Sequence, residues 1–358
     1  METLLWIGFS QSLFSATLFL LVKKEQSLSN KILSAWLFIF AFEFLSTAID
    51  HTLGFTHLTN PFLIFNPLLY FYSRSLIKAG MKLRWRQLWH VAPYLFFKIG
   101  AYLDSTQISF SDFYNISINT WFNFTFGVIS VGSFFGYSIL SLIMVHRYRM
   151  NLKNEFSTLS SKITLGWLIF VIIVYLSFMV TAYLLGLIDL LFREETFVTI
   201  ITYTFSLGLI YIFSFYGLLQ QQIYTLVAEE QTEKYKNPRL SPQTINEEVA
   251  KLKKYFQEEE PFLDSELSVY TVSEKLALSR HSLTEVLNTG TGRNFYQFVN
   301  DYRIERVKQK LVDPGFRKYS IDAIGFECGF KSKSTFYDVF KKYTGLTPSQ
   351  FRASQDIK

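Results

Sequence analysis

The sequence predicts an all-α protein in two parts, a polytopic bundle of seven transmembrane helices followed by a soluble all-helical domain. Of its 358 residues, 49% are hydrophobic and 18% are aromatic, which is too apolar for one ordinary soluble domain. The apolar residues concentrate before Leu219, whereas nearly all of the dense charge follows it. We therefore expect a transmembrane, sensory domain at residues 1–219, a helical connector at 220–262 and a terminal domain at 263–358.

The seven spans are predicted from runs of mostly apolar residues, because a helix needs about 20 of them to cross a bilayer. Five runs meet this requirement, and two are weaker. The third span is short and contains Asn66 and Pro67, whereas the fourth contains His90, Pro93 and Lys98. Both are retained because the distribution of charge requires them. The spans are predicted at residues 4–22, 32–49, 61–77, 88–103, 121–145, 163–187 and 197–219.

The charges of the short loops predict the orientation, because positive residues stay on the cytoplasmic side. If the amino terminus lies outside, the inner loops contain twelve Lys and Arg residues and the outer loops contain only Arg193. The terminal domain then lies in the cytoplasm. Omitting both weak spans keeps it there, but omitting one would place it outside. The twelve are Lys23, Lys24, Lys31, Arg74, Lys78, Lys82, Arg84, Arg86, Arg147, Arg149, Lys153 and Lys162.

Two ionisable residues fall inside predicted spans, Glu43 and Lys98. Each lies twelve residues after an inner-loop cation, Lys31 and Arg86 respectively, so the two side chains should lie at similar depth. Charges at membrane depth are costly and usually pair or line a cavity. We expect a Glu43–Lys98 pair, with a structural role favoured over ligand sensing. The alternative is that Lys98 extends to the outer surface.

The sequence holds no pattern typical of an enzyme or a metal protein. Its one cysteine, Cys328, cannot form an intrachain disulfide, and its five histidines show no metal-ligand spacing. Of the histidines, His90 sits at the inner edge of a span without a catalytic partner. We expect no catalytic residues, no metal and no cofactor.

The connector contains a second helix that begins with Ser241 as N-cap and Pro242 at the first helical position. This helix either packs on the terminal domain or pairs with a second copy of itself, and intramolecular packing is favoured. Its apolar stripe consists of Ile245, Val249, Leu252 and Phe256.

The terminal domain contains a repeat with an offset of 53 residues. Each unit has a serine N-cap, an apolar stripe at helical spacing, a glycine stop and an aromatic anchor. We expect a helix at 271–278 and a turn at 277–279 before the first capped helix, which should reach residue 287. The matched pairs are Ser279 and Ser332, Leu283 and Phe336, Val286 and Val339, Leu287 and Phe340, Gly292 and Gly345, and Phe298 and Phe351.

A helix is predicted between the units at residues 300–312, with Tyr302, Ile304, Val307 and Leu311 apolar. A rigid connecting helix fixes the separation of the two capped helices, and helices about 34 Å apart can enter successive major grooves of one duplex. From Thr271 onward, fifteen Lys and Arg residues against nine Asp and Glu leave a net charge of +6, as suits a phosphate backbone. The sequence therefore predicts a DNA-binding domain with two helix-turn-helix units.

The terminal domain carries a specific set of motifs, which are the run 321–330, Ser332, Ser334, Phe336, the runs 340–345 and 347–352, and in the first unit Ser279, Leu283, Gly292, Phe295 and Arg303. With these motifs it resembles the terminal domain of the AraC/XylS family of bacterial transcription regulators. The resemblance covers about the last ninety residues, and the alanine usual at one position is Val307 here. Residues 66–74 and 89–93 also resemble a seven-span membrane domain found fused to this module, which implies a bacterial inner-membrane location.

The resemblance implies that the second helix of each unit enters the major groove. Side chains at the start of such a helix reach base edges, whereas flanking cations suit phosphates. The candidates for base contact are Arg280, His281, Thr284, Glu285, Lys333, Ser334, Tyr337 and Asp338. The candidates for phosphate contact are Arg293, Lys331, Lys341 and Lys342.

These observations predict a membrane-bound transcription regulator whose bundle senses a signal and whose terminal domain binds specific double-stranded DNA. The expected partners are DNA, the lipid bilayer, RNA polymerase, a small-molecule or envelope signal, and a second copy in a homodimer. The alternative is a transporter or channel with a regulatory DNA-binding tail. Against it, the spans show no inverted repeat and no paired broken helices.

Overall fold

The structure is a computed structural model that describes residues 1–21, 28–53, 62–78, 81–103, 120–159, 164–192, 195–219 and 240–356. The chain divides into two compact units. The first comprises residues Met1–Arg147 and Leu165–Gln231, and the second comprises Tyr148–Thr164 and Thr232–Lys358. The short segment after the long helix α6 therefore belongs with the carboxyl-terminal part of the chain.

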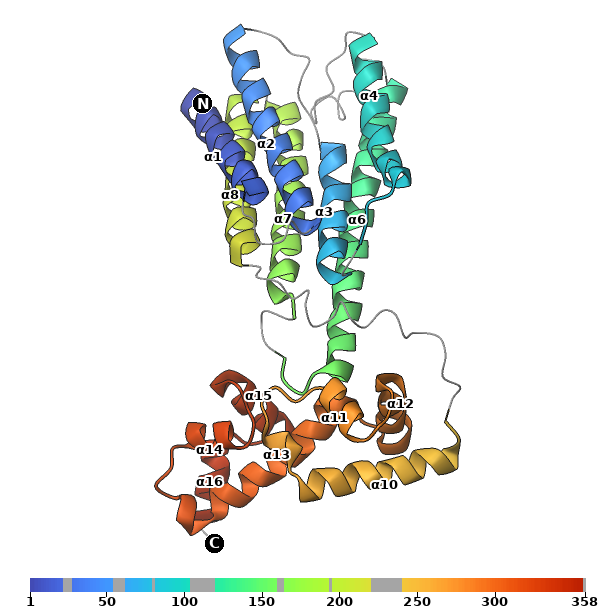
Figure 1. The fold of residues 1–358 in the computed structure, drawn as a ribbon. Coiled ribbons are helices and arrows are strands. Elements are labelled where there is room, and N and C mark those ends of the chain that lie inside the picture. The colour runs from blue at the N-terminus through green and yellow to red at the C-terminus, as the bar shows by residue number, and fades with distance from the viewer. Residues whose placement is uncertain are drawn as a thin grey trace. The chain divides into compact units, whose positions relative to one another are not determined.

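The first unit is built from helices, several of them long (Figure 1). Helix α6 extends past the boundary of this unit, so its last residues belong to the second. The elements are α1 (Glu2–Leu21), α2 (Leu28–Leu53), α3 (Phe62–Ile77), the 3-10 helix η1 (Trp85–Val91), α4 (Ala92–Leu103), α6 (Thr120–Glu155), α7 (Gly166–Phe192) and α8 (Glu195–Leu219).

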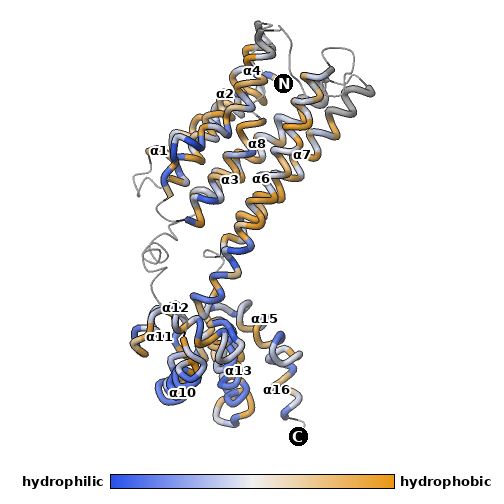
Figure 2. Tube along the Cα trace, turned by 90° about the vertical axis from the view of Figure 1, so that its right-hand side faces the viewer, coloured by the Kyte–Doolittle hydropathy of each residue, from blue (hydrophilic) through white to orange (hydrophobic). Residues whose placement is uncertain are grey.

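Aromatic packing fills the interior of the first unit. Trp36 of α2 is fully buried, and its ring centroid lies 4.5 Å from that of Phe213 on α8 and 6.0 Å from that of Tyr175 on α7. Large apolar side chains also cover the outside, such as Phe96 and Phe215, and Figure 2 shows α6, α7 and α8 hydrophobic over most of their lengths. An apolar exterior suits lipid rather than water, and it suggests a membrane region.

Five of the described helices are long and apolar enough to cross a membrane, judged by length and composition. They coincide with the five spans that the sequence predicts from long apolar runs. The two weaker predictions fall on α3 and α4, which are helical but contain only 16 and 12 residues. The five are Glu2–Leu21, Leu28–Ile49, Phe124–Glu155, Gly166–Leu185 and Ile200–Leu218.

Asn66, whose polarity weakened the prediction of the third span, is a buried interhelical contact. The Tyr175 hydroxyl of α7 donates to Asn66 Oδ1 at 2.6 Å, and Asn66 Nδ2 donates to Ser133 Oγ of α6 at 3.2 Å. Hydrogen bonds between helices satisfy polar groups that would be costly in an apolar interior. Asn66 therefore links α3 to both α6 and α7.

The second unit is a set of shorter helices. We call α11 with α12 the first helix pair and α14 with α15 the second helix pair, and residues 240–356 together the C-terminal module. The elements are α10 (Pro242–Glu258), η3 (Pro261–Leu263), α11 (Val269–Lys275), α12 (Arg280–Glu285), the π-helical turn η4 (Val286–Thr291), α13 (Phe295–Val312), η5 (Pro314–Phe316), α14 (Ile321–Glu327), α15 (Lys333–Thr344) and α16 (Pro348–Asp356).

Two apolar cores hold the C-terminal module together, and α13 contributes to both. Its first half places Phe295, Phe298 and Val299 in the first core, with residues of α10 and the first helix pair. Its second half places Ile304 and Val307 in the second core, with residues of the second helix pair. Helix α13 is therefore the common element on which both helix pairs pack.

The predicted connector helix is confirmed. Helix α10 begins at Pro242, and the Ser241 side chain accepts a hydrogen bond from the Thr244 amide at 3.1 Å. Its residues Leu252 and Phe256 are buried in the first core, so the helix packs within its own chain, as the sequence favoured.

Candidate nucleic-acid interface

Helix α12 is the second helix of the first pair. The Ser279 side chain caps its start by accepting from the Ser282 amide at 3.0 Å, and Leu283 anchors its inner face in the first core. Its candidate base-reading side chains lie on the outside, with His281 exposed and Thr284 and Glu285 half-buried. The half-buried Arg280 guanidinium lies 4.7 Å from the ring centre of Tyr270.

Helix α15 repeats this arrangement in the second pair. The Ser332 side chain accepts from the Thr335 amide at 3.2 Å, while Phe336, Val339 and Phe340 form its buried face. The opposite face carries the candidates, with Lys333, Ser334 and Asp338 exposed and Tyr337 half-buried. Both helices therefore present capped amino-terminal ends and a polar outer face, as insertion into a groove requires.

The two members of the 53-residue repeat share backbone features as well as side-chain features. Gly292 and Gly345 both end their helical segments in the left-handed conformation, with φ of 66° and 76°. Phe298 is buried in the first core, and Phe351 packs against the second. The two helix pairs differ after their second helices. Helix α12 continues as the π-helical turn η4, whereas α15 is a regular α-helix throughout.

Several of the candidate cations form ion pairs within the module. Lys333 Nζ lies 2.8 Å from Asp322 Oδ2, and this hydrogen bond raises the pKa of Lys333. Arg293 Nε lies 3.3 Å from Asp301 Oδ2, and Lys331 pairs with Glu266. Exposed pairs of this kind contribute little to stability, so phosphate or base contacts can replace them at small cost. The other phosphate candidates, Lys341 and Lys342, lie exposed in the last turn of α15.

Arg303 and Gly329 join the loop before the first helix pair to the turn within the second helix pair. The Arg303 side chain is 1% exposed, donates from Nε to the Phe262 carbonyl at 2.8 Å and from Nη2 to the Asp264 carbonyl at 2.7 Å. Gly329, at the turn after α14, is buried with φ of 89° and approaches the same Phe262 carbonyl. Burial lowers the pKa of Arg303 to about 10, which leaves it charged at neutral pH.

Cys328 lies in the second core, fully buried beside this junction. Burial raises the pKa of its thiol to about 11, so little reactive thiolate exists near neutral pH. We expect maleimide to modify Cys328 at pH 8 at least about a hundredfold more slowly in the native protein than in urea. Equal rates in the two states would contradict the placement of this residue. Because it is the chain's one cysteine, the reaction reports directly on the second core.

Polar groups of the first unit form separate networks. Glu43 of α2 is 7% exposed and accepts a hydrogen bond from the Tyr203 hydroxyl of α8 at 3.2 Å, and that hydroxyl also contacts Thr47. Lys98 lies half-buried on α4. The contact of Glu43 with α8 is one that sequence spacing does not indicate.

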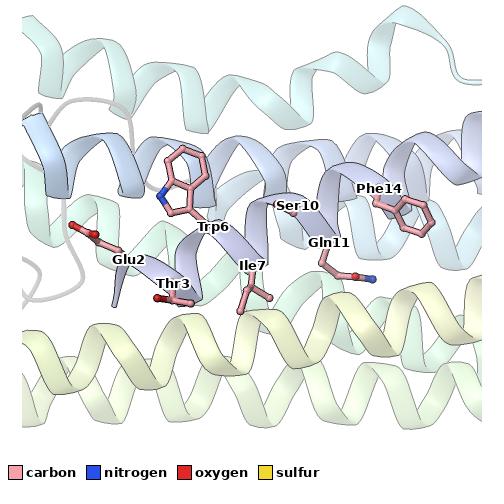
Figure 3. Close-up of a pocket in the computed structure, with 7 residues that line it drawn as sticks. All are labelled: Glu2, Thr3, Trp6, Ile7, Ser10, Gln11 and Phe14. Carbon is pink, nitrogen blue, oxygen red and sulfur yellow. The ribbon is translucent and has the colours of Figure 1, made fainter.

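A hollow of about 660 Å³ lies beside α1. Among the described residues, those that line it all come from one helix, as Figure 3 shows, so no second described element supplies the converging groups that specific recognition needs. The lining residues are Glu2, Thr3, Trp6, Ile7, Ser10, Gln11 and Phe14.

Comparison with known proteins identifies the carboxyl-terminal segment. Residues 272–354 match the family described as "Helix-turn-helix domain". The C-terminal module carries a helix-turn-helix domain of the AraC type. The resemblance inferred from its motifs is thereby confirmed for this part of the chain.

Curated relatives that match this AraC-type domain are bacterial regulators. An uncharacterized transcriptional regulatory protein, YesN of Bacillus subtilis, is 33% identical over 24% of this chain and 23% of its own length. The Msm operon regulatory protein of Streptococcus mutans is 33% identical over 25% of this chain and 31% of its own. An uncharacterized regulator from Pseudoalteromonas carrageenovora is 30% identical over 25% of this chain and 50% of its own length. The chain thus spans half or less of these relatives.

A solved structure of a protein of unknown function from Listeria innocua is also similar. It is 25% identical, covering 29% of this chain and 94% of that protein, with a TM-score of 0.26. That score is too low to support an inference about this fold.

Proposed function

We propose that this protein is a membrane-bound transcription regulator that binds specific DNA through two helix-turn-helix units, the first and second helix pairs. The observation that carries the proposal is the repeated arrangement of α12 and α15, each serine-capped with a polar outer face, inside a matched helix-turn-helix domain. Helix α13 packs on both pairs and would set the distance between them on the duplex.

The apolar helices of the first unit support membrane anchoring. We propose seven spans, with the amino terminus outside and the C-terminal module at the cytoplasmic face of a bacterial inner membrane, because twelve loop cations against one then lie inside. In this arrangement the bundle senses a small-molecule or envelope signal, and Glu43 and Lys98 lie at similar depth within it. RNA polymerase and a second copy of the chain are the further partners we propose.

The proposal is tested by genome-wide capture of DNA with the intact protein in membranes, compared with the fragment 241–358. Recovery of defined sites by both proteins, with occupancy that responds to growth conditions only for the intact chain, is the expected result. Failure of either protein to enrich any site over bulk DNA would refute the DNA-binding role. Identical occupancy under all conditions would reduce the first unit to an anchor.

Base reading by the two helices should appear as altered sequence preference. We expect Glu285→Ala in α12 and Lys333→Ala in α15 each to lower affinity for the preferred duplex and to relax discrimination at one base pair. The measurement is binding to duplexes that differ singly within one half-site. Asp322→Asn removes the partner of Lys333 without removing the cation, so it should preserve the preference. Equal losses on every duplex would contradict base contact by these side chains.

Phosphate contact predicts a different signature at Lys341. We expect Lys341→Ala to weaken all duplexes alike and to make the slope of log affinity against log salt shallower by about 1. Lys254→Ala is the matched control. Lys254 is also exposed, but it lies on α10, which packs on the first core and carries none of the candidate contacts. An unchanged salt slope in Lys341→Ala would place this lysine outside the interface.

A further inference from the structure

The segment that follows α6 packs on the C-terminal module within the second unit. Phe156 pairs with Ser268 as an isolated antiparallel bridge. Next to it, the Ser157 amide and its hydroxyl both donate to the Leu267 carbonyl, at 3.2 and 2.6 Å. Ser157 is 1% exposed. We call residues 156–158 the docking segment.

Arg303 donates three of its five hydrogen bonds to the docking segment. Its Nη1 donates to the Ser157 carbonyl at 3.2 Å and to Thr158 Oγ1 at 3.1 Å, and its Nη2 donates to Ser157 Oγ at 3.2 Å. A guanidinium has five N–H donors, so three are directed at the docking segment and two at the carbonyls of the module itself. Because hydrogen bonds to a buried charge are strong, the docking segment contributes more than half of the bonds that hold this guanidinium.

The docking site coincides with the junction between the two helix pairs. Arg303 lies in α13 where the first core ends and the second begins, and its guanidinium lies 5.8 Å from the ring centre of Phe330. Lys331, in the turn before α15, pairs with Glu266 in the loop that receives the docking segment. A change at this site therefore acts on the loop that leads into the first helix pair and on the turn within the second helix pair.

We propose that residues 156–158 form a direct signal contact, through which helix α6 acts on the DNA-binding module at the junction of its two helix pairs. The inference rests on the proposed function and adds a second route beside the connector at 220–262. When the docking segment is bound, it holds the two helix pairs in one relative orientation. Movement of α6 pulls the docking segment out of its site. Loss of docking then loosens the pairs, lowers affinity for a two-half-site duplex and widens the half-site spacing that is accepted.

Docking itself is tested by disulfide formation in the full-length protein in isolated membranes. Facing residues of an antiparallel pair have Cα atoms about 4.5–5.5 Å apart, within reach of a disulfide. A protease site placed within residues 220–239 allows the cross-linked halves to be seen as one band after cleavage. We expect Phe156→Cys with Ser268→Cys to cross-link under mild oxidant. Asn151→Cys with Ser268→Cys, in which the first cysteine sits at an exposed position of α6, should not.

Absence of the Phe156–Ser268 cross-link, or its formation only between two chains, overturns docking within one molecule. The single variants control for reaction with Cys328, which burial protects. Ser268 caps α11, so the single Ser268→Cys variant also reports the cost of losing that cap.

Coupling to DNA is tested with the full-length protein in nanodiscs and a duplex selected by the wild type from a random library of about 40 base pairs, long enough for two half-sites. Ser157→Leu cannot fit its buried position, and we expect affinity to fall about fivefold to tenfold and altered half-site spacing to be tolerated. Ser157→Ala, which removes only the hydroxyl contacts, should show a smaller loss. Asn151→Leu adds the same bulk at an exposed position and should match the wild type.

Maleimide protection of Cys328 shows whether each variant stays folded. Wild-type affinity in a folded Ser157→Leu protein overturns the coupling. If the wild type itself selects no duplex, the proposed function fails, and the cross-link still decides whether the segment docks.

Discussion

Gly329→Ala should destabilise the C-terminal module by about 3 kcal/mol or more, combining left-handed strain with overpacking. Gly329 is buried with φ of 89°, a conformation that an alanine adopts only with strain. A methyl group there would lie 2.9 Å from Arg303 Nε and 3.0 Å from the Leu263 carbonyl, and closer still to the Phe262 carbonyl. The loop that Arg303 holds must therefore move away from the second helix pair. Urea unfolding of the fragment 240–358, which contains both cores, measures the change in free energy.

Gly345→Ala is the matched control for backbone strain without crowding. Gly345 also has positive φ, at 76°, but nothing lies within 4 Å of an added methyl group. We expect it to cost about 1 kcal/mol, the price of the left-handed conformation alone. Equal losses in the two variants would show that the approach of Gly329 to the Phe262 carbonyl does not contribute.

The repeat was predictable because its signals are local. A serine cap, an apolar stripe and a glycine stop act within one or two turns, so Ser279 and Ser332 could be matched before any packing was known. The start of α13 was predicted wrongly, at residue 300 rather than Phe295. A capping box was present, since Asn294 accepts from the Gln297 amide and the Gln297 side chain accepts from Asn294 N. This spacing of Asn and Gln could have corrected the boundary.

The docking segment could not be predicted, because its partners are distant in sequence. Ser157 and Arg303 are separated by 146 residues, and no periodicity connects a loop after an apolar helix with a buried arginine. The family motif marks Arg303 as important but indicates no partner for its side chain. The same limit applies to Glu43, where matched depth suggested Lys98 and the structure adds Tyr203 from α8.

Arg303→Met should cost about 3 kcal/mol or more in the fragment 240–358, because a hydrogen bond to a charged group contributes about 1.5 kcal/mol or more. Within this fragment, the bonds lost are those to the carbonyls of Phe262 and Asp264. Both carbonyls belong to the loop between α10 and α11, and methionine offers them no donor. Arg303→Lys keeps the charge but concentrates its donors on one atom, so it should recover only part of the loss.

Arg306→Met is the control for Arg303→Met, one turn later on the same helix. Arg306 pairs with Glu260, and both side chains are about one-third exposed, at 32% and 36%. Because such pairs contribute about 1 kcal/mol or less, the control should unfold near the wild-type urea concentration. A comparable loss in both variants would mean that burial of Arg303 adds nothing. A larger loss at Arg303 in the intact chain than in the fragment would measure the extra bonds made by the docking segment, since only the intact chain contains Ser157 and Thr158.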